Sequence, residues 1–326
     1  MAHINCPDCP NCGSEDTKKN GRDRHKRQRF LCQSCNKTFG DGQPPPQKPV
    51  EGMYLGLEKA KLITHLLVEG TSVSATARIA QVHKRTVLNL LVRMGEKCQR
   101  ILDREVQNVT ANHIQADEIW TFVMKKQKRV KFDDPKSWGD AYCFISLDAE
   151  TKLAISHEIG KRNGQTAVRF ISDLHSRLAD DCKPQLTTDG FKPYIDAVED
   201  SFGGDIDYGM LIKLFQGEVE PGRERYSPGG LLAIVKSIVT GNPDEDLIST
   251  SYIERQNRTV RMAVRRFTRL VDAFSKKLEN LKAACALHFA YYNFCRQHLS
   301  LDGCTPAMEA GLTDHIWEIE ELLEAA

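Results

Sequence analysis

Two C-x-x-C pairs near the start of the chain constrain its fold most. The first pair is Cys9 and Cys12, the second is Cys32 and Cys35, and nineteen residues separate them. This spacing is typical of four thiolates that hold one zinc ion tetrahedrally. The segment 18–30 between the pairs is polar and basic and has too few apolar residues to fold alone, so the metal would supply the missing stabilisation. The sequence therefore predicts a structural zinc ribbon over residues 1–40, with these four cysteines as ligands.

The first pair leaves an alternative open. Cys6 forms an overlapping C-x-x-C with Cys9 and could replace Cys12 or Cys9 as a ligand. Gly13 favours Cys12, because glycine gives the backbone the freedom that a turn facing the sulfur atoms needs. A redox C-x-x-C is the rival interpretation, but such motifs open a helix after a strand, and this context is missing from the sequence around them. The other six cysteines show no pairing pattern, and small core residues are expected there: Cys98, Cys143, Cys182, Cys285, Cys295 and Cys304.

A proline- and glycine-rich stretch, residues 41–52, follows the ribbon and predicts an extended linker. Three helices are expected after it. Apolar residues recur with helical period from Leu57 until Gly70, residues 72–80 form a second short helix, and residues 84–94 form a third. A tight turn before a basic third helix is typical of a helix-turn-helix, whose last helix enters the major groove. The segment 53–108 is therefore predicted to bind DNA, with a plain three-helix bundle as the alternative.

The third helix has two different faces. Val87, Leu88, Leu91 and Val92 form an apolar face. The polar residues on the remaining surface are available for solvent or a DNA groove: Lys84, Arg85, Asn89 and Arg93.

The pattern changes after residue 108. Residues 113–123 are predicted to form a strand with Asp117 in its middle, and residues 140–156 a hairpin. Residues 164–178 have helical periodicity, and residues 184–190 form a short strand that ends in Asp189-Gly190. Three antiparallel strands, a helix and another strand are the ribonuclease-H-like plan. The predicted fold is thus multidomain, with an α/β domain over residues 109–326 that has a mixed five-stranded sheet and C-terminal helices.

Asp117 and Asp189 are expected to meet in this plan, because the strands that carry them lie side by side. Carboxylates gathered at one point repel each other, and divalent cations relieve that repulsion. Magnesium is the natural ion, since it prefers a few carboxylates together with water and phosphate oxygens. Two such ions about 4 Å apart can activate a water or a 3′-hydroxyl on one side of a phosphodiester and stabilise the leaving oxygen on the other.

A later helix is expected to supply a third acid, for which Glu254 is the candidate. Core-facing apolar residues recur around it at helical spacing, and a second face carries arginines at steps of three and four. Two alternatives remain for Glu254: Ser251-x-x-Glu254 fits a helix capping box, and Glu254 with Arg258 fits an ordinary i,i+4 ion pair. The residues predicted to contact DNA here are Asn257, Arg258, Arg261 and Arg265.

The formal net charge of +1 hides two cationic stretches. Residues 18–37 hold eight Lys/Arg against one acid, and residues 255–277 again hold eight against one. Local charge density rather than the total is what a phosphate backbone experiences, so nucleic acid stays a candidate partner. The sequence shows no run of eighteen apolar residues and no basic-plus-apolar leader, which predicts a cytoplasmic protein, associated with the nucleoid when it is bound to DNA, with no membrane partner.

These motifs together resemble those of DDE transposases, most closely the insertion-sequence-one family. The resemblance covers nearly the whole chain. It is carried by the cysteine ribbon ending in Lys37-Thr38-Phe39, by Gln115-Ala116-Asp117-Glu118-Ile119-Trp120, by Thr188-Asp189, by Tyr208-Gly209 before Lys213, by Ile253-Glu254-Arg255-Gln256-Asn257, and by Tyr292-Asn293 with Thr305-Pro306-Ala307. Compact members of the family place the glutamate nearer the second aspartate. Here an insert over residues 201–243 intervenes, and the rival acids are Glu218, Glu220, Glu224 and Glu245.

The resemblance implies that Asp117, Asp189 and Glu254 bind magnesium, with Mn²⁺ as an alternative, for DNA cleavage and strand transfer. Two ions are expected when DNA is bound. The implied partners are double-stranded DNA, both terminal inverted repeats and target, and further copies of the chain, because two element ends must be handled together. A domesticated DNA-binding protein without strand transfer, and a metal-dependent nuclease of the same fold, are the alternative functions.

Overall fold

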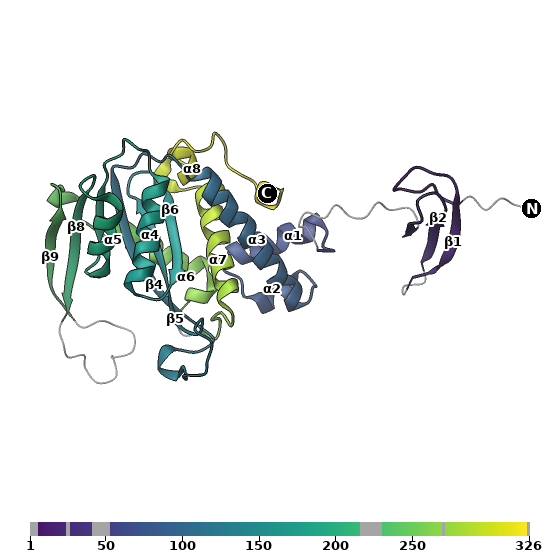
Figure 1. Ribbon diagram of the computed structural model, residues 1–326, viewed down its shortest axis with the longest axis horizontal. Helices are drawn as coiled ribbons and strands as arrows, with labels where there is room; N and C mark the ends of the chain where they lie inside the picture. Colours follow the sequence, from purple (N-terminus) through teal and green to yellow (C-terminus); the bar gives the residue numbers. More distant parts are fainter. Residues whose placement is uncertain (1–5, 24–26, 41–52, 216–229, 269–270, 325–326) are drawn as a thin grey trace, which may run out of the picture. The chain divides into compact units, whose positions relative to one another are not determined.

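A computed structural model describes residues 6–23, 27–40, 53–215, 230–268 and 271–324 (Figure 1). The chain divides into two compact units, Met1–Ala60 and Lys61–Ala326. The predicted linker 41–52 and the rival acids Glu218, Glu220 and Glu224 lie outside the described residues. None of the described helices is long and apolar enough to cross a membrane.

The N-terminal unit is built on a small antiparallel sheet. Its strands are β1 (Thr17–Arg22), β2 (Gln28–Cys32) and β3 (Thr38–Gly40), in the order β1-β2-β3. Phe30 on β2 stacks on Phe39 on β3, with ring centroids 5.7 Å apart. Apart from Phe30, the buried hydrophobic residues of this sheet and its turns are cysteines, Cys9 and Cys32. So small an apolar core agrees with the expectation that a metal stabilises this unit.

Three helices lie where the sequence predicted them: α1 (Leu57–Val68), α2 (Val73–Ile79) and α3 (Lys84–Glu105). The Ser72 hydroxyl caps α2 by accepting a hydrogen bond from the Ala75 backbone N–H. The third helix was predicted to end near Met94 but continues to Glu105, because its buried side of Met94, Cys98 and Ile101 runs on beyond the predicted end. The DNA-binding role of these helices and the domain boundaries at residues 53, 108 and 109 stay predictions.

The larger unit contains a mixed six-stranded sheet. Its strands are β4 (His113–Val123), β5 (Gly139–Asp148), β6 (Ala154–Gly160), β7 (Gln185–Thr188), β8 (Asp207–Phe215) and β9 (Leu231–Thr240). Their order is β6-β5-β4-β7-β8-β9, with β4–β7 and β7–β8 parallel and the other pairs antiparallel. Five strands were predicted. The structure has six, and both β8 and β9, which pair at the edge, arise inside the 201–243 insert, where no strand was predicted.

Helices cover both faces of this sheet. On one face, Phe144 of β5 contacts Phe170 of α4 (Gly164–Arg177) and Tyr194 of α5 (Pro193–Phe202). On the other, α6 (Ser251–Ala263) packs against β4 and β5. The other helices in the described residues are α7 (Leu278–Ala290), α8 (Pro306–Glu309) and α9 (Ile319–Glu324). Short 3₁₀ turns lie at Gln127–Arg129, Glu245–Leu247, Arg265–Phe267 and Leu299–Leu301, and a π-helical turn lies at Tyr291–Cys295.

The contact between α3 and α7 depends on a glycine, and Figure 1 shows the two helices side by side. A Cβ on Gly95 of α3 would come within 2.3 Å of the Ala283 Cα atom of α7. We expect Gly95→Ala to lower the free energy of unfolding by about 2 kcal/mol, because overpacking against backbone outweighs the ~1 kcal/mol gain in helix propensity. Gly164→Ala, at the start of α4, is the control, since its added Cβ meets no heavy atom within 4 Å. Chemical denaturation that finds Gly95→Ala as stable as this control would contradict the close packing.

Candidate functional site

The four predicted zinc ligands come together in the structure. One sulfur from each of Cys9, Cys12, Cys32 and Cys35 lies within 4.8 Å of the others, and the Cys9–Cys35 and Cys12–Cys32 sulfur pairs are each 3.6 Å apart. Cys6 is not part of this group.

The backbone around the thiols also suits a metal. Gly13 adopts a positive φ of 69°, as expected for a residue that turns the chain after Cys12. A hydrogen bond from the Cys35 backbone N–H lowers the pKa of Cys32 to about 6, which favours the thiolate that a metal binds. Four thiols with this spacing and no carboxylate ligand fit structural zinc.

The second group of metal-binding side chains lies where β4 and β7 run parallel. Ala116 pairs with Thr188, so the next residue of each strand, Asp117 and Asp189, lies at the same level of the sheet. Their carboxylates, together with that of Glu118, lie within 4.8 Å of one another. The expected meeting of Asp117 and Asp189 is therefore observed, and strand pairing rather than loop conformation produces it.

Glu118 is a member of this group that the sequence did not predict. Successive residues of a strand point to opposite faces, and Glu118 lies opposite Phe144 in the register, on the face covered by α4 and α5. Its side chain is only 2% exposed, and its Oε1 atom is buried without a hydrogen-bond partner. The strand alternation that places Asp117 on the α6 face gave no reason to expect its neighbour at the same site.

Arg162, between β6 and α4, connects two of the acids. Its Nε atom lies 3.2 Å from Glu118 Oε2, and one of its terminal nitrogens lies 3.2 Å from Asp189 Oδ2. The guanidinium also lies 4.1 Å from the centre of the Phe191 ring. No pattern in the sequence marked this residue, because its contacts come from segments that are distant along the chain.

Glu254 lies beside the group but outside it. Gln115 of β4 holds the start of α6 by accepting hydrogen bonds from the Tyr252 and Ile253 backbone N–H groups, at 2.9 and 3.0 Å. The Glu254 carboxylate accepts a hydrogen bond from Thr250 at 2.7 Å and forms an ion pair with Lys213 of β8. Burial alone would raise its pKa, but these hydrogen bonds lower it below the ordinary value. Its role as a metal ligand stays a prediction.

The acids raise one another's proton affinity. Burial, and then the charge of Asp189, raise the pKa of Asp117 to about 6 and that of Glu118 to about 7. Deprotonating both groups therefore creates a concentration of negative charge that water does not fully solvate. A divalent cation would relieve this repulsion, which is the electrostatic property expected of a magnesium site.

The raised pKa of Glu118 predicts a pH-dependent stability difference. A carboxyl whose folded-state pKa is raised binds its proton more tightly when folded, so the folded state loses stability as pH rises from about 4.5 to about 7. Glu118→Gln cannot ionise, so its free energy of unfolding should increase by on the order of 2–3 kcal/mol relative to that of the wild type as the pH rises over this range. Denaturation at pH 5 and pH 8 without divalent cations measures the difference. A difference that does not change with pH would contradict the burial of a charged Glu118.

The predicted DNA contacts fall into two groups. On α3, all four candidates are exposed: Lys84, Arg85, Asn89 and Arg93. On α6, Arg258 is exposed and Arg261 half-buried. The helix ends at Ala263, so the exposed Arg265 lies in a separate 3₁₀ turn rather than on one continuous helical ridge.

Asn257 differs from the other predicted DNA contacts. It is 4% exposed, and its amide donates a hydrogen bond to Asp117 Oδ2 at 2.7 Å. The structure thus places Asn257 among the acids, where it orients Asp117, rather than on the exposed face with the arginines.

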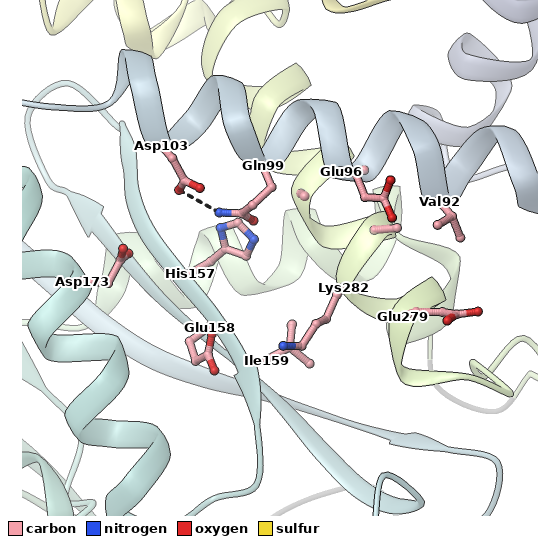
Figure 2. A pocket seen from close by; sticks show the side chains of 13 residues that line it. Val92, Glu96, Gln99, Asp103, His157, Glu158, Ile159, Asp173, Glu279 and Lys282 are labelled. Atoms are coloured by element: carbon pink, nitrogen blue, oxygen red, sulfur yellow. Dashed lines mark hydrogen bonds between the residues drawn. The ribbon is translucent and has the colours of Figure 1, made fainter. Parts of the chain in front are cut away.

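A cavity of about 480 Å³ lies between α3, β6 and α7 and contains none of the acids described above. Figure 2 shows Gln99, which donates to Asp103 at 2.9 Å, next to His157. Burial lowers the pKa of His157 to about 4 and keeps its ring neutral at physiological pH. The acidic group does not extend into this cavity.

Comparison with known proteins gives only remote likenesses. No protein-family model matches the chain, and no curated protein matches it in sequence. A piggyBac transposase synaptic complex with hairpin DNA is similar with a TM-score of 0.36 and 10% identity, over 85% of this chain and 72% of that chain. The Mos1 strand transfer complex gives 0.22 and 14%, over 81% of each chain. A Mos1 paired-end complex with the left transposon end gives 0.19 and 16%, over 51% of this chain and 60% of that one. Likenesses at these TM-scores do not establish a shared fold.

Proposed function

We propose that this chain is a DDE-type DNA transposase whose larger unit has a ribonuclease-H-like core. The observation that carries the proposal is the convergence of Asp117 and Asp189, which lie 72 positions apart in the sequence, at one level of two parallel strands. The strand order supports the ribonuclease-H-like core, because three antiparallel strands are followed by a helix and a parallel strand beside the first. The sequence motifs that resemble the insertion-sequence-one family also point to this activity.

The acids fit magnesium, because carboxylate oxygens are hard ligands and this group is crowded and partly buried. When bound, the ions would activate a water or 3′-hydroxyl and stabilise the leaving oxygen of a phosphodiester. In the protein, Asp117 and Asp189 would hold the ions, and Asn257 would fix the orientation of Asp117. We include Glu254 as the third acid, since it lies at the start of α6 beside Asp117 and contributes to the rise in its pKa.

We further propose that the two cationic regions bind the DNA backbone. The ribbon over residues 1–40, stabilised by zinc, and the exposed polar face of α3 would recognise the element ends. Arg258 on α6 and Arg265 in the 3₁₀ turn after it are both exposed and would hold the strand to be cut. Joining two ends to one target requires at least two active sites, so the working form would be a homo-oligomer on DNA.

A strand-joining assay tests this function. Purified protein, magnesium and a labelled element end should give a product in which the end is joined to target DNA. Nicking without joining would indicate a metal-dependent nuclease, and retention of the end without either reaction would indicate a DNA-binding protein without catalysis. Inverted repeats flanking the gene, where the surrounding DNA sequence contains them, would supply the element end for this assay.

A further inference from the structure

The carboxylate of Glu118 has few hydrogen-bond partners for a side chain so deeply buried. Its side chain is 2% exposed, and one oxygen, Oε2, is shared with Arg162 while the other, Oε1, is buried without a hydrogen-bond partner. A buried charged oxygen without a partner is costly, and native structures rarely keep one without a function. The Tyr194 hydroxyl is likewise buried without a partner at hydrogen-bond distance, yet it lies close enough to Glu118 to lower the pKa of that carboxyl.

The position that a cation would take between Glu118 and Asp189 already holds a positive charge. The Arg162 guanidinium reaches both acids at 3.2 Å, one nitrogen to each. Its side chain is 36% exposed and rests on the Phe191 ring, so it lies at the surface rather than in the core. Arg162 is thus a cation at the acidic group that can leave it for solvent or for a phosphate.

We propose that Glu118 and Asp189 form a divalent-cation site that Arg162 fills until the metal displaces it. This inference rests on the proposed function and adds Glu118 to the acids named there. One carboxylate oxygen from each of Asp117, Glu118 and Asp189 lies within 4.8 Å of the others, whereas two oxygens bound to one magnesium lie about 3.0 Å apart when adjacent and about 4.2 Å apart when opposite. Rotations of these side chains, available once Arg162 leaves, would bring the oxygens into this range.

The partners of Glu254 explain why a divalent cation would need a carboxylate in addition to that of Glu254. Its Oε1 atom already accepts hydrogen bonds from Lys213 and Thr250, and it approaches from the α6 side of the sheet. Glu118 comes from the α4 and α5 side, next to Asp189. The displaced guanidinium would remain close to the acids, where it can contact the phosphate of a bound DNA strand. Metal binding and DNA binding would then support each other without a further structural change.

Mn²⁺ binding, followed by the electron paramagnetic resonance signal of the free ion, tests this exchange on the full zinc-loaded chain without DNA. Glu118→Gln should weaken Mn²⁺ binding about tenfold, because a ligand is lost. Arg162→Gln should strengthen it about tenfold, because the competing cation is gone; tenfold corresponds to ~1.4 kcal/mol, the sum expected for the ion pairs of Arg162 with Glu118 and Asp189. Glu158→Gln and Arg169→Gln remove a similar ion pair, 3.0 Å long, outside the acidic group and should leave binding unchanged.

Asp189→Asn separates the two possible failures. If it weakens Mn²⁺ binding while Glu118→Gln and Arg162→Gln leave it unchanged, the metal site is real and the exchange with Arg162 is wrong. If Asp189→Asn also leaves binding unchanged, the metal site of the proposed function fails as well. Should Glu118→Gln fail to fold, Arg162→Gln at its half-exposed position decides alone, and unchanged or weaker Mn²⁺ binding there overturns the proposal.

Discussion

Replacing Asp189 with asparagine should abolish strand joining, with a loss of at least about 10³-fold in rate. Asparagine keeps the size of the side chain but removes the charge that attracts a divalent ion. Metal stabilisation of the transition state contributes several kcal/mol, which converts to a rate factor of about this size. Retention of the element end on a filter should stay near the wild-type level, because the exposed cations of α3 and α6 are unchanged. A labelled-end assay with magnesium, run beside the retention measurement, checks both expectations.

Asp196→Asn is the matched control for this variant. Asp196 is exposed on α5, so the same chemical change there should leave joining and stability at wild-type levels. Joining by Asp189→Asn at the rate of this control would remove Asp189 from the active site. A loss of both joining and DNA retention would instead indicate that the substitution disturbs the fold, which circular dichroism would show directly.

Replacing Cys32 with serine should unfold residues 1–40 and release the zinc. The sulfur of Cys32 is fully buried in the cysteine group, and the described part of this unit buries few other apolar side chains. In small metal-dependent domains the binding free energy, about 10 kcal/mol or more, is the folding free energy. Zinc content should fall from one ion per chain towards zero, limited proteolysis should cut within the first forty residues, and retention of element ends should weaken.

Cys6→Ser provides the comparison for the ribbon. Cys6 lies outside the group of four, so this variant should keep its zinc and its resistance to proteolysis. Zinc loss by Cys6→Ser, with zinc retained by Cys32→Ser, would mean that the ligand set is wrong. Full end recognition by a zinc-free ribbon would contradict its proposed role in binding DNA.

Local patterns in the sequence were sufficient to predict the strands whose pairing follows from the alternation of apolar residues and from their order along the chain. The first four strands of the large sheet and the helix between the third and fourth are examples. Because neighbouring parallel strands place their equivalent residues at one level, the meeting of Asp117 and Asp189 followed from the strand order. The four cysteines met for a similar reason, since each C-x-x-C turn brings its two thiols to one side.

Features that depend on tertiary contacts were missed. The strands β8 and β9 pair with each other inside the 201–243 insert, for which no strand was predicted. The arginines after Glu254 were predicted to share one helical face, yet α6 ends at Ala263 and Arg265 lies in a separate 3₁₀ turn. Glu118 was overlooked because strand alternation points it away from Asp117. It joins the group because Asp189, just beyond the end of β7, lies near both Asp117 and Glu118.

The convergence of acids on a divalent ion is most directly tested by anomalous X-ray scattering at the manganese edge from crystals of the protein bound to an element end and Mn²⁺. An anomalous peak within bonding distance of both Asp117 and Asp189 is the expected result. Strong manganese peaks elsewhere in the complex, with these two carboxylates free of metal, would contradict it.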